Sequence, residues 1–228
     1  MSHPTRAELV QDVAKLVLEE LARHGVSIVP GRPRRVPVGV TARHVHLTAE
    51  HMEVLFGPGR QLTKYKDISQ PGQFAANEQV MLIGPAGTID RVRILGPYRK
   101  QTQVELSPSD ARKLGIDAPI RSSGDLEGTP GISIVGPRGS LRLNQGCIIA
   151  DRHIHMTPAD AAAFGVADGQ AVRVRIQGSR SGIMDQVKIR VRDDFALDMH
   201  IDTDDANAFG IRHGDQVELV LEEERPEP

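Results

Sequence analysis

The chain has 228 residues, and its 28 Lys and Arg against 30 Asp and Glu give a formal charge of -2 at pH 7. This balance, with an aromatic content of 3% and no Trp, argues against nucleic-acid binding, which normally shows a basic surplus or stacking aromatic residues. A single Cys excludes an intrachain disulfide. No apolar run approaches the roughly 18 residues that span a bilayer, and no secretion signal is evident at the N-terminus. We therefore expect an intracellular protein without a membrane partner.

The first segment differs from the rest of the chain. Its apolar residues recur at helical spacing, so we expect an amphipathic helix over residues 5–24, ended by Gly25. A linker rich in Pro and Arg follows. Two interpretations remain open: the helix is an oligomer contact or lid on the main body, or it is a detachable targeting helix recognised through its apolar face.

From residue 36 onward, short β segments and turns dominate. Residues 80–89 and 132–141 each contain an apolar run, a Gly-Pro-x-Gly turn and a second run, which predicts the same hairpin twice. Many short strands with Gly and Pro turns and few helices favour a mainly β fold of barrels or sandwiches. Further strands are expected at 90–96, 100–106, 145–150, 170–177, 184–192, 195–201 and 215–222.

An internal repeat occurs four times, and each copy is a strand that leads into a capped helix of about two turns. The expected N-cap residues carry a side-chain oxygen that accepts free amide hydrogens: Thr48, Ser107, Thr157 and Asp202. An Asp lies three residues after three of the caps, near the positive end of the helix dipole: Asp110, Asp160 and Asp205. A Gly ends the same three helices: Gly115, Gly165 and Gly210.

Residue types that bind metal ions stand two positions before every cap: His46, Glu105, His155 and His200. Two copies add a second histidine two residues earlier, His44 and His153, and strand alternation points both imidazoles of each pair to one side. A lone histidine before a helix is more often an ordinary surface or core residue, but recurrence in matching contexts favours a metal site. Six ligands in threes predict two metal ions, each with an open position as in catalytic zinc; cobalt, iron or nickel remain possible.

The remaining candidates are basic residues and the single thiol. Lys64, Lys66, Arg93 and Arg99 are possible anion contacts, and most such residues are solvated surface charges. Arg99 is favoured because its chain position keeps it near a ligand and because Arg suits bidentate phosphate binding. Cys147 could be a nucleophile or a ligand, but we favour a buried strand residue.

Several separated motifs together resemble the PduL-type phosphotransacylases, also called phosphate propanoyltransferases. The resemblance extends from about residue 36 to residue 220, and no Cys or Ser nucleophile is part of it. The motifs are Arg43–His46, Gln70–Ala75, Ile94–Pro97, Lys100–Glu105, Ser123–Asp125, Arg152–Met156 and Met199–Asp204.

The resemblance implies an enzyme that interconverts a short-chain acyl-CoA, such as propanoyl-CoA, and phosphate with acyl phosphate and CoA. It implies two small β-barrel domains capped by short α-helices: residues 32–42 with 151–222, and residues 43–150, after an N-terminal segment of residues 1–31. It implies two zinc ions, one held by His44, His46 and Glu105 and the other by His153, His155 and His200. Arg99 would contact phosphate, and Lys66, Arg93 and Asn207 would line the pocket.

The N-terminal helix would resemble an encapsulation peptide, which implies shell proteins as partners and a bacterial microcompartment or the cytoplasm as the location. We expect a homo-oligomer. As a mechanism we expect metal-assisted, direct attack of phosphate on the thioester, because no side-chain nucleophile is evident. Two alternatives stay open: a zinc-dependent thioesterase, in which the metal activates water, and a non-catalytic scaffold stapled by zinc.

Overall fold

The computed structural model describes residues 13, 16, 17, 20, 23 and 34–221. The chain divides into one unit of residues 1–34 and another of residues 35–228. The helix predicted over residues 5–24 and the linker after it lie largely outside the described residues. Among the helices that are described, none combines the length and the apolar character needed to cross a membrane.

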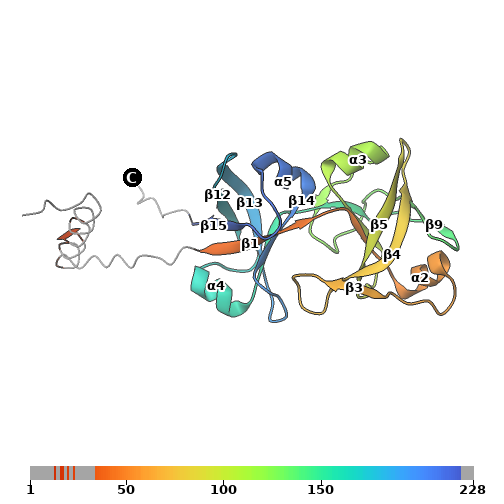
Figure 1. The fold of residues 1–228 in the computed structure, drawn as a ribbon, viewed down its shortest axis with the longest axis horizontal. Helices are drawn as coiled ribbons and strands as arrows, with labels where there is room; N and C mark the ends of the chain where they lie inside the picture. The colour runs from red at the N-terminus through yellow and green to blue at the C-terminus, as the bar shows by residue number, and fades with distance from the viewer. Residues whose placement is uncertain (1–12, 14–15, 18–19, 21–22, 24–33, 222–228) are drawn as a thin grey trace, which may run out of the picture. The chain divides into compact units, whose positions relative to one another are not determined.

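Six strands close into a barrel that joins the start of the second unit to its end (Figure 1). β1 pairs in parallel with β14 and antiparallel with β15, so the first strand completes a sheet made of the last third of the chain. In β12 every second residue is buried, as expected for a strand with one face on a core. The order around the barrel is β1 (Arg35–Thr41), β14 (Asp198–Asp202), β11 (His153–Met156), β13 (Gly182–Val191), β12 (Ala171–Ile176) and β15 (Gln216–Val220).

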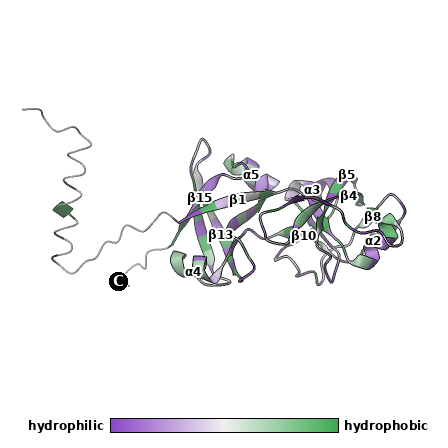
Figure 2. Ribbon diagram, turned by 60° about the horizontal axis from the view of Figure 1, so that its bottom comes forward, coloured by the Kyte–Doolittle hydropathy of each residue, from purple (hydrophilic) through white to green (hydrophobic). Residues whose placement is uncertain are grey.

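The middle of the chain forms a second, nine-stranded sheet, with order β7-β10-β6-β2-β5-β4-β8-β9 and β3 paired to β4. Each sheet surrounds its own apolar core, and hydrophobic stretches mark the strands of both (Figure 2). The predicted mainly β fold is confirmed, as one closed barrel and one curled sheet. The strands are β2 (His44–His46), β3 (Lys64–Asp67), β4 (Phe74–Ile83), β5 (Thr88–Gly96), β6 (Gln103–Leu106), β7 (Ile120–Arg121), β8 (Ser133–Val135), β9 (Ser140–Arg142) and β10 (Cys147–Ala150).

Four short helices follow the strands of the repeat: α2 (Ala49–Phe56), α3 (Pro108–Leu114), α4 (Pro158–Phe164) and α5 (Thr203–Phe209). All four predicted N-caps are confirmed, since each cap side chain accepts a hydrogen bond from a backbone amide of the first turn. Thr157 and Asp160 form a complete capping box. The three predicted terminal glycines adopt the left-handed conformation that glycine tolerates best. The local signals of the repeat therefore determine where these helices begin and end.

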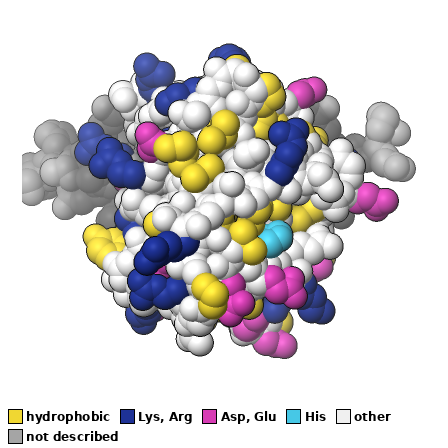
Figure 3. Space-filling model, turned by 90° about the vertical axis from the view of Figure 1, so that its right-hand side faces the viewer, with side chains coloured by type: hydrophobic (Ala, Val, Ile, Leu, Met, Phe, Trp, Pro, Cys, Tyr) yellow, Lys and Arg dark blue, Asp and Glu magenta, His cyan; other side chains and the backbone are white. Residues whose placement is uncertain are grey.

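The two predicted hairpins are confirmed as β4–β5 and β8–β9, and their turns bind the ends of helices. The amide of Ala86 donates to the carbonyl of Leu114 in α3 (3.0 Å), and the amide of Arg138 donates to the carbonyl of Leu55 in α2 (3.0 Å). A Cβ at Gly136 would overlap this same helix backbone, so the turn requires glycine. Figure 3 views the end of the molecule that carries α2 and β9, where apolar side chains form small groups among charged ones.

Candidate metal centres and the cavity between the two sheets

Strand pairing brings the six predicted ligands together in two groups. β2 and β6 run antiparallel with His44 opposite Glu105, and β11 and β14 run antiparallel with His153 opposite His200. Within each group, one candidate ligand atom from each residue lies within 4.8 Å of the others. The groups are His44, His46 and Glu105 in one sheet, and His153, His155 and His200 in the barrel.

Backbone carbonyls orient three of these histidines. Because a carbonyl oxygen only accepts hydrogen bonds, Nδ1 of each ring carries the proton and Nε2 keeps its lone pair. Metal-binding histidines use the same arrangement, in which one nitrogen donates to the protein and the other faces the metal. The pairs are His44 with Ala42 (3.0 Å), His46 with Leu95 (3.2 Å) and His153 with Asp151 (2.7 Å).

A buried carboxylate orients the fourth histidine. Nε2 of His200 lies 3.0 Å from Oδ2 of Asp198, so Nε2 donates and Nδ1 keeps the lone pair. Gly39 on β1 makes room for this pair, because a Cβ there would lie 2.7 Å from Oδ2 of Asp198. Asp198 was not among the predicted site residues, although its spacing of two residues from His200 on one strand places it on the same face.

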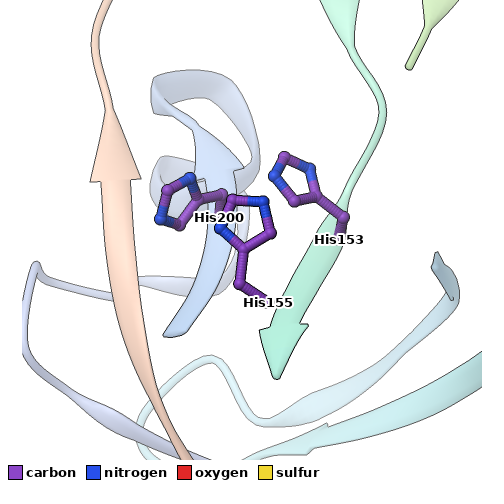
Figure 4. Close-up of side chains that lie close together, drawn as sticks. All are labelled: His153, His155 and His200. Carbon is purple, nitrogen blue, oxygen red and sulfur yellow. The ribbon is translucent and has the colours of Figure 1, made fainter. Parts of the chain in front are cut away.

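His155 shows most directly that the barrel group fits a metal ion. Both of its ring nitrogens are buried and have no hydrogen-bond partner in the part of the chain that is described. Leaving a buried polar group unsatisfied costs about 1–3 kcal/mol, and a metal ion would satisfy one nitrogen. The rings of His153 and His200 lie 4.6 and 4.8 Å from the His155 ring, and the three are turned toward one another (Figure 4).

The protonation states of the histidines suit metal binding. Burial, together with the neighbouring charge of His200, lowers the pKa of His153 to about 4. Burial also lowers the pKa of His155 and that of His46 well below the ordinary value of 6.5. These imidazoles are therefore neutral at pH 7, which is the form that binds a metal ion.

Glu105 supplies the negative charge of the other group. Its oxygens lie 3.4 Å from Nε2 of His44 and 3.7 Å from Nε2 of His46. Burial raises the pKa of Glu105, but the two histidines outweigh burial and hold the pKa well below its usual range. For His44 the directions are reversed. Burial lowers its pKa, but the nearby carboxylate of Glu105 has the larger combined effect, so the pKa of His44 is raised above its ordinary value. Two imidazoles and one carboxylate form a donor set that zinc accepts.

A hydrogen-bond network links Glu105 to Arg99 through Ser123. The Ser123 hydroxyl accepts from Nη1 of Arg99 (2.8 Å) and donates to Oε1 of Glu105 (3.1 Å). The amide of Gln103 donates to both Ser123 and Glu105, and its oxygen accepts from the amide of Gly124 (2.7 Å). The guanidinium and the carboxylate are therefore held by one hydroxyl, a contact that no motif spacing revealed.

A cavity of about 1120 Å³ lies between the two sheets and is lined by residues of both histidine groups. Of the predicted substrate contacts, Lys66, Arg93 and Arg99 line this cavity. Asn207 lies exposed on α5 and is not among the lining residues, so its role stays a prediction. Arg190 also lines the cavity, and sequence reasoning missed it because only the pairing of β13 with β11 brings it there.

Cys147 is a buried core residue on β10. Burial raises the pKa of its thiol to about 12, so it is neutral at pH 7. Because the thiolate is the reactive form of cysteine, this residue is unsuited to act as a nucleophile.

Comparison with known proteins identifies the family. The family model of phosphate propanoyltransferase matches residues 37–212. A phosphate propanoyltransferase of Thermotoga maritima is 56% identical over 80% of this chain and 88% of the relative. Another, of Priestia megaterium, is 49% identical over 95% of this chain and 98% of the relative, and one of Rhodobacter capsulatus is 48% identical over 89% and 94%. The chain therefore belongs to the phosphate propanoyltransferase family and is an acyltransferase.

Proposed function

We propose that this acyltransferase moves a short acyl group, such as propanoyl, between CoA and phosphate by direct attack in the cavity between the two sheets. An oxygen of hydrogen phosphate forms a bond to the thioester carbonyl carbon, and the carbon–sulfur bond then breaks. The proton of the hydrogen phosphate is left on the CoA thiol. Acyl phosphate and CoA are the products, and the reverse reaction uses the same steps.

The observation that carries this proposal is the pair of histidine groups that line one cavity together with Arg99. We propose that these groups hold two metal ions, zinc being the best fit to their donors. A bound metal ion would supply a Lewis acid that binds anionic oxygen and stabilises developing negative charge. The ligand sets contain three residues each, as in catalytic zinc sites that keep a position open.

Arg99 is proposed to bind phosphate. Burial lowers the pKa of Arg99, but a guanidinium keeps its charge at neutral pH. Its hydrogen bond to Ser123 uses one N–H group of the forked guanidinium, and the other N–H groups remain for a phosphate oxygen. Most of the acceleration would then come from orientation and from stabilisation of charge on the carbonyl oxygen.

Arg93 and Lys66 are proposed to complete the positive wall of the cavity. Nη1 of Arg93 donates to the carbonyl of Ala76 (2.5 Å), and its guanidinium lies 4.9 Å from the centre of the Tyr65 ring. The Arg93 side chain is thus held in place before a substrate arrives. Lys66 is exposed at the cavity and can approach an anion as a mobile point charge.

The side chains of the cavity support direct attack without a covalent acyl-enzyme. The Cys147 thiol is neutral and buried among apolar residues. The Ser123 hydroxyl already donates to Glu105, and its oxygen accepts from Arg99 and Gln103. The carboxylate that accepts from Ser123 is Glu105, which we place among the metal ligands, whereas a nucleophilic serine requires a base that is free to take its proton.

A thiol-release assay distinguishes this function from the thioesterase alternative. The purified protein, loaded with Zn²⁺, is given propanoyl-CoA with and without inorganic phosphate, and hydroxylamine traps any acyl phosphate. We expect CoA release that requires phosphate, with one hydroxamate formed for each thiol. Release without phosphate, and without hydroxamate, would mean that water is the acceptor.

Three further proposals follow from the resemblance alone. First, the chain would contain two domains, one made of residues 32–42 with 151–222 and the other of residues 43–150. Second, the N-terminal segment, residues 1–31, would be an encapsulation peptide for a bacterial microcompartment. Third, the enzyme would be a homo-oligomer. A chain that begins at residue 32 tests the second proposal. It should keep its activity and lose co-sedimentation with shell proteins, and retained co-sedimentation would contradict the assignment.

A further inference from the structure

Arg190 places a second guanidinium at the cavity, from the opposite sheet to Arg99. It lies on β13 beside His155 in the parallel register of β13 with β11, and both residues line the cavity. Arg99 belongs to the loop between β5 and β6 of the nine-stranded sheet. The two arginines therefore approach the cavity from its two different walls.

Within the described part of the chain, the guanidinium of Arg190 has no hydrogen bond and no ion pair. Cζ of Arg190 lies 5.9 Å from the centre of the Phe195 ring. Other arginines near the cavity are satisfied: Arg192 pairs with Asp194 (2.7 Å), and Arg99 donates to Ser123 (2.8 Å). A half-buried cation without a partner is costly, and an anionic ligand is the group that would satisfy it.

The two arginines lie close enough for the charge of Arg190 to affect the pKa of Arg99. Burial lowers the pKa of Arg99, and the charge of Arg190 lowers it further, against the opposing effect of Glu105. Burial and the charge of Arg192 lower the pKa of Arg190, and the more distant carboxylates of Glu105 and Asp168 oppose this without forming an ion pair with it. Two cations that repel one another across a cavity are stabilised together by a dianion placed between them.

We propose that Arg190 is a second phosphate-binding residue and that it holds the transferred phosphate from the side opposite Arg99. This inference rests on the proposed function and adds a residue to it. The same guanidinium could instead meet the phosphates of the CoA nucleotide, because the chemistry is identical. The position of Arg190 beside His155, a proposed metal ligand that lines the same cavity, favours the transferred phosphate.

Steady-state kinetics of Arg190→Gln test the proposal on full-length protein loaded with Zn²⁺. We expect the KM for inorganic phosphate to rise by about 10- to 100-fold, as for loss of a charge-assisted hydrogen bond. Arg190→Lys keeps the positive charge but not the paired N–H donors of the guanidinium, so its KM for phosphate should lie between those of the parent and Arg190→Gln. The same rise should appear with propanoyl-pantetheine, a thioester that lacks the nucleotide phosphates.

Controls separate this inference from the proposed function and from folding. Arg175→Gln removes one positive charge from the same barrel at an exposed pair with Glu218 (3.5 Å), and its phosphate KM should equal that of the parent. Metal content and thermal unfolding should match between Arg190→Gln and the parent. An unchanged phosphate KM, or a change seen with propanoyl-CoA but absent with propanoyl-pantetheine, would overturn the inference while phosphate-dependent activity of the parent still stands.

Discussion

Arg152 and Asp205 form a bidentate ion pair, with Nε and Nη2 each 2.7 Å from a carboxylate oxygen. Arg152 directly precedes His153, and Asp205 lies in the first turn of α5, just after the strand that carries His200. The pair therefore fastens together the two segments that supply the barrel group of histidines. Arg43 and Asp110 stand in the equivalent positions of the other sheet and form a longer pair (3.2 Å).

Arg152→Gln should loosen the barrel group without removing any candidate ligand. Because partners of this kind hold ligands in position, we expect the affinity for Zn²⁺ to fall by about 10-fold. The free energy of unfolding should fall by about 1 kcal/mol, since the pair is partly exposed. Competition with a chromogenic chelator measures the affinity. Arg175→Gln breaks an exposed pair on the same barrel and serves as the control; equal affinities for all three proteins would contradict the role given to Arg152.

His155→Ala should remove one metal ion and leave the other. Elemental analysis should give about two zinc ions per parent chain and about one for this variant, because the two ligand groups lie in different sheets. His46→Ala should remove the other ion. His213→Ala changes an exposed histidine outside both groups and should keep the parent stoichiometry. Unchanged metal content in His155→Ala would rule out the barrel site.

Ser123→Ala should impair phosphate use more than folding. The substitution removes the hydroxyl that fixes Arg99 relative to Glu105, so we expect kcat/KM for phosphate to fall by about 10-fold. Ser123→Thr keeps a hydroxyl and should recover most of the activity. Ser122→Ala is the matched control, since its side chain makes no hydrogen bond to the described residues. Similar losses in Ser123→Ala and Ser123→Thr would show that packing, not the hydroxyl, matters here.

The stability of the metal-free protein should depend on pH between about 4 and 6.5. The pKa of His153 is about 4 in the folded chain, whereas an unfolded histidine has a pKa of 6.5. As the pH falls through this window the unfolded chain takes up protons first, so folding stability is lost on acidification and rises with pH. Thermal unfolding in a chelator, at several values of pH, measures the slope. His153→Gln should reduce the slope, and an identical slope would disprove the assignment.

Sequence patterns predicted the local elements well because their causes are local. Thr48, Ser107, Thr157 and Asp202 cap helices because each side chain reaches amides two or three residues away. Strand alternation likewise places the two imidazoles of each His-x-His pair on one face. The expected hairpins and most strand positions follow from similar short-range signals.

Short-range sequence patterns did not predict the contacts between segments that are distant along the chain. The pairing of β1 with β14 and β15 depends on the closure of the barrel; the family resemblance implied that these segments belong together, but no pattern near β1 does. Arg190 reaches the cavity only because β13 lies beside β11 in one particular register. Ser123 meets Arg99 and Glu105 through a loop whose path is set by the whole sheet. The cavity is therefore lined in part by residues that no spacing rule selects.

Metal removal and reconstitution test whether the two histidine groups hold the metal ions that the activity requires. The purified protein is treated with a chelator, and its zinc content and its phosphate-dependent release of CoA from propanoyl-CoA are measured on the same sample. We expect activity to be lost as zinc is removed and to return when about two Zn²⁺ per chain are restored. Circular dichroism should show that the stripped protein remains folded. Full activity in folded protein that contains no metal would show that the two histidine groups do not act through bound metal ions.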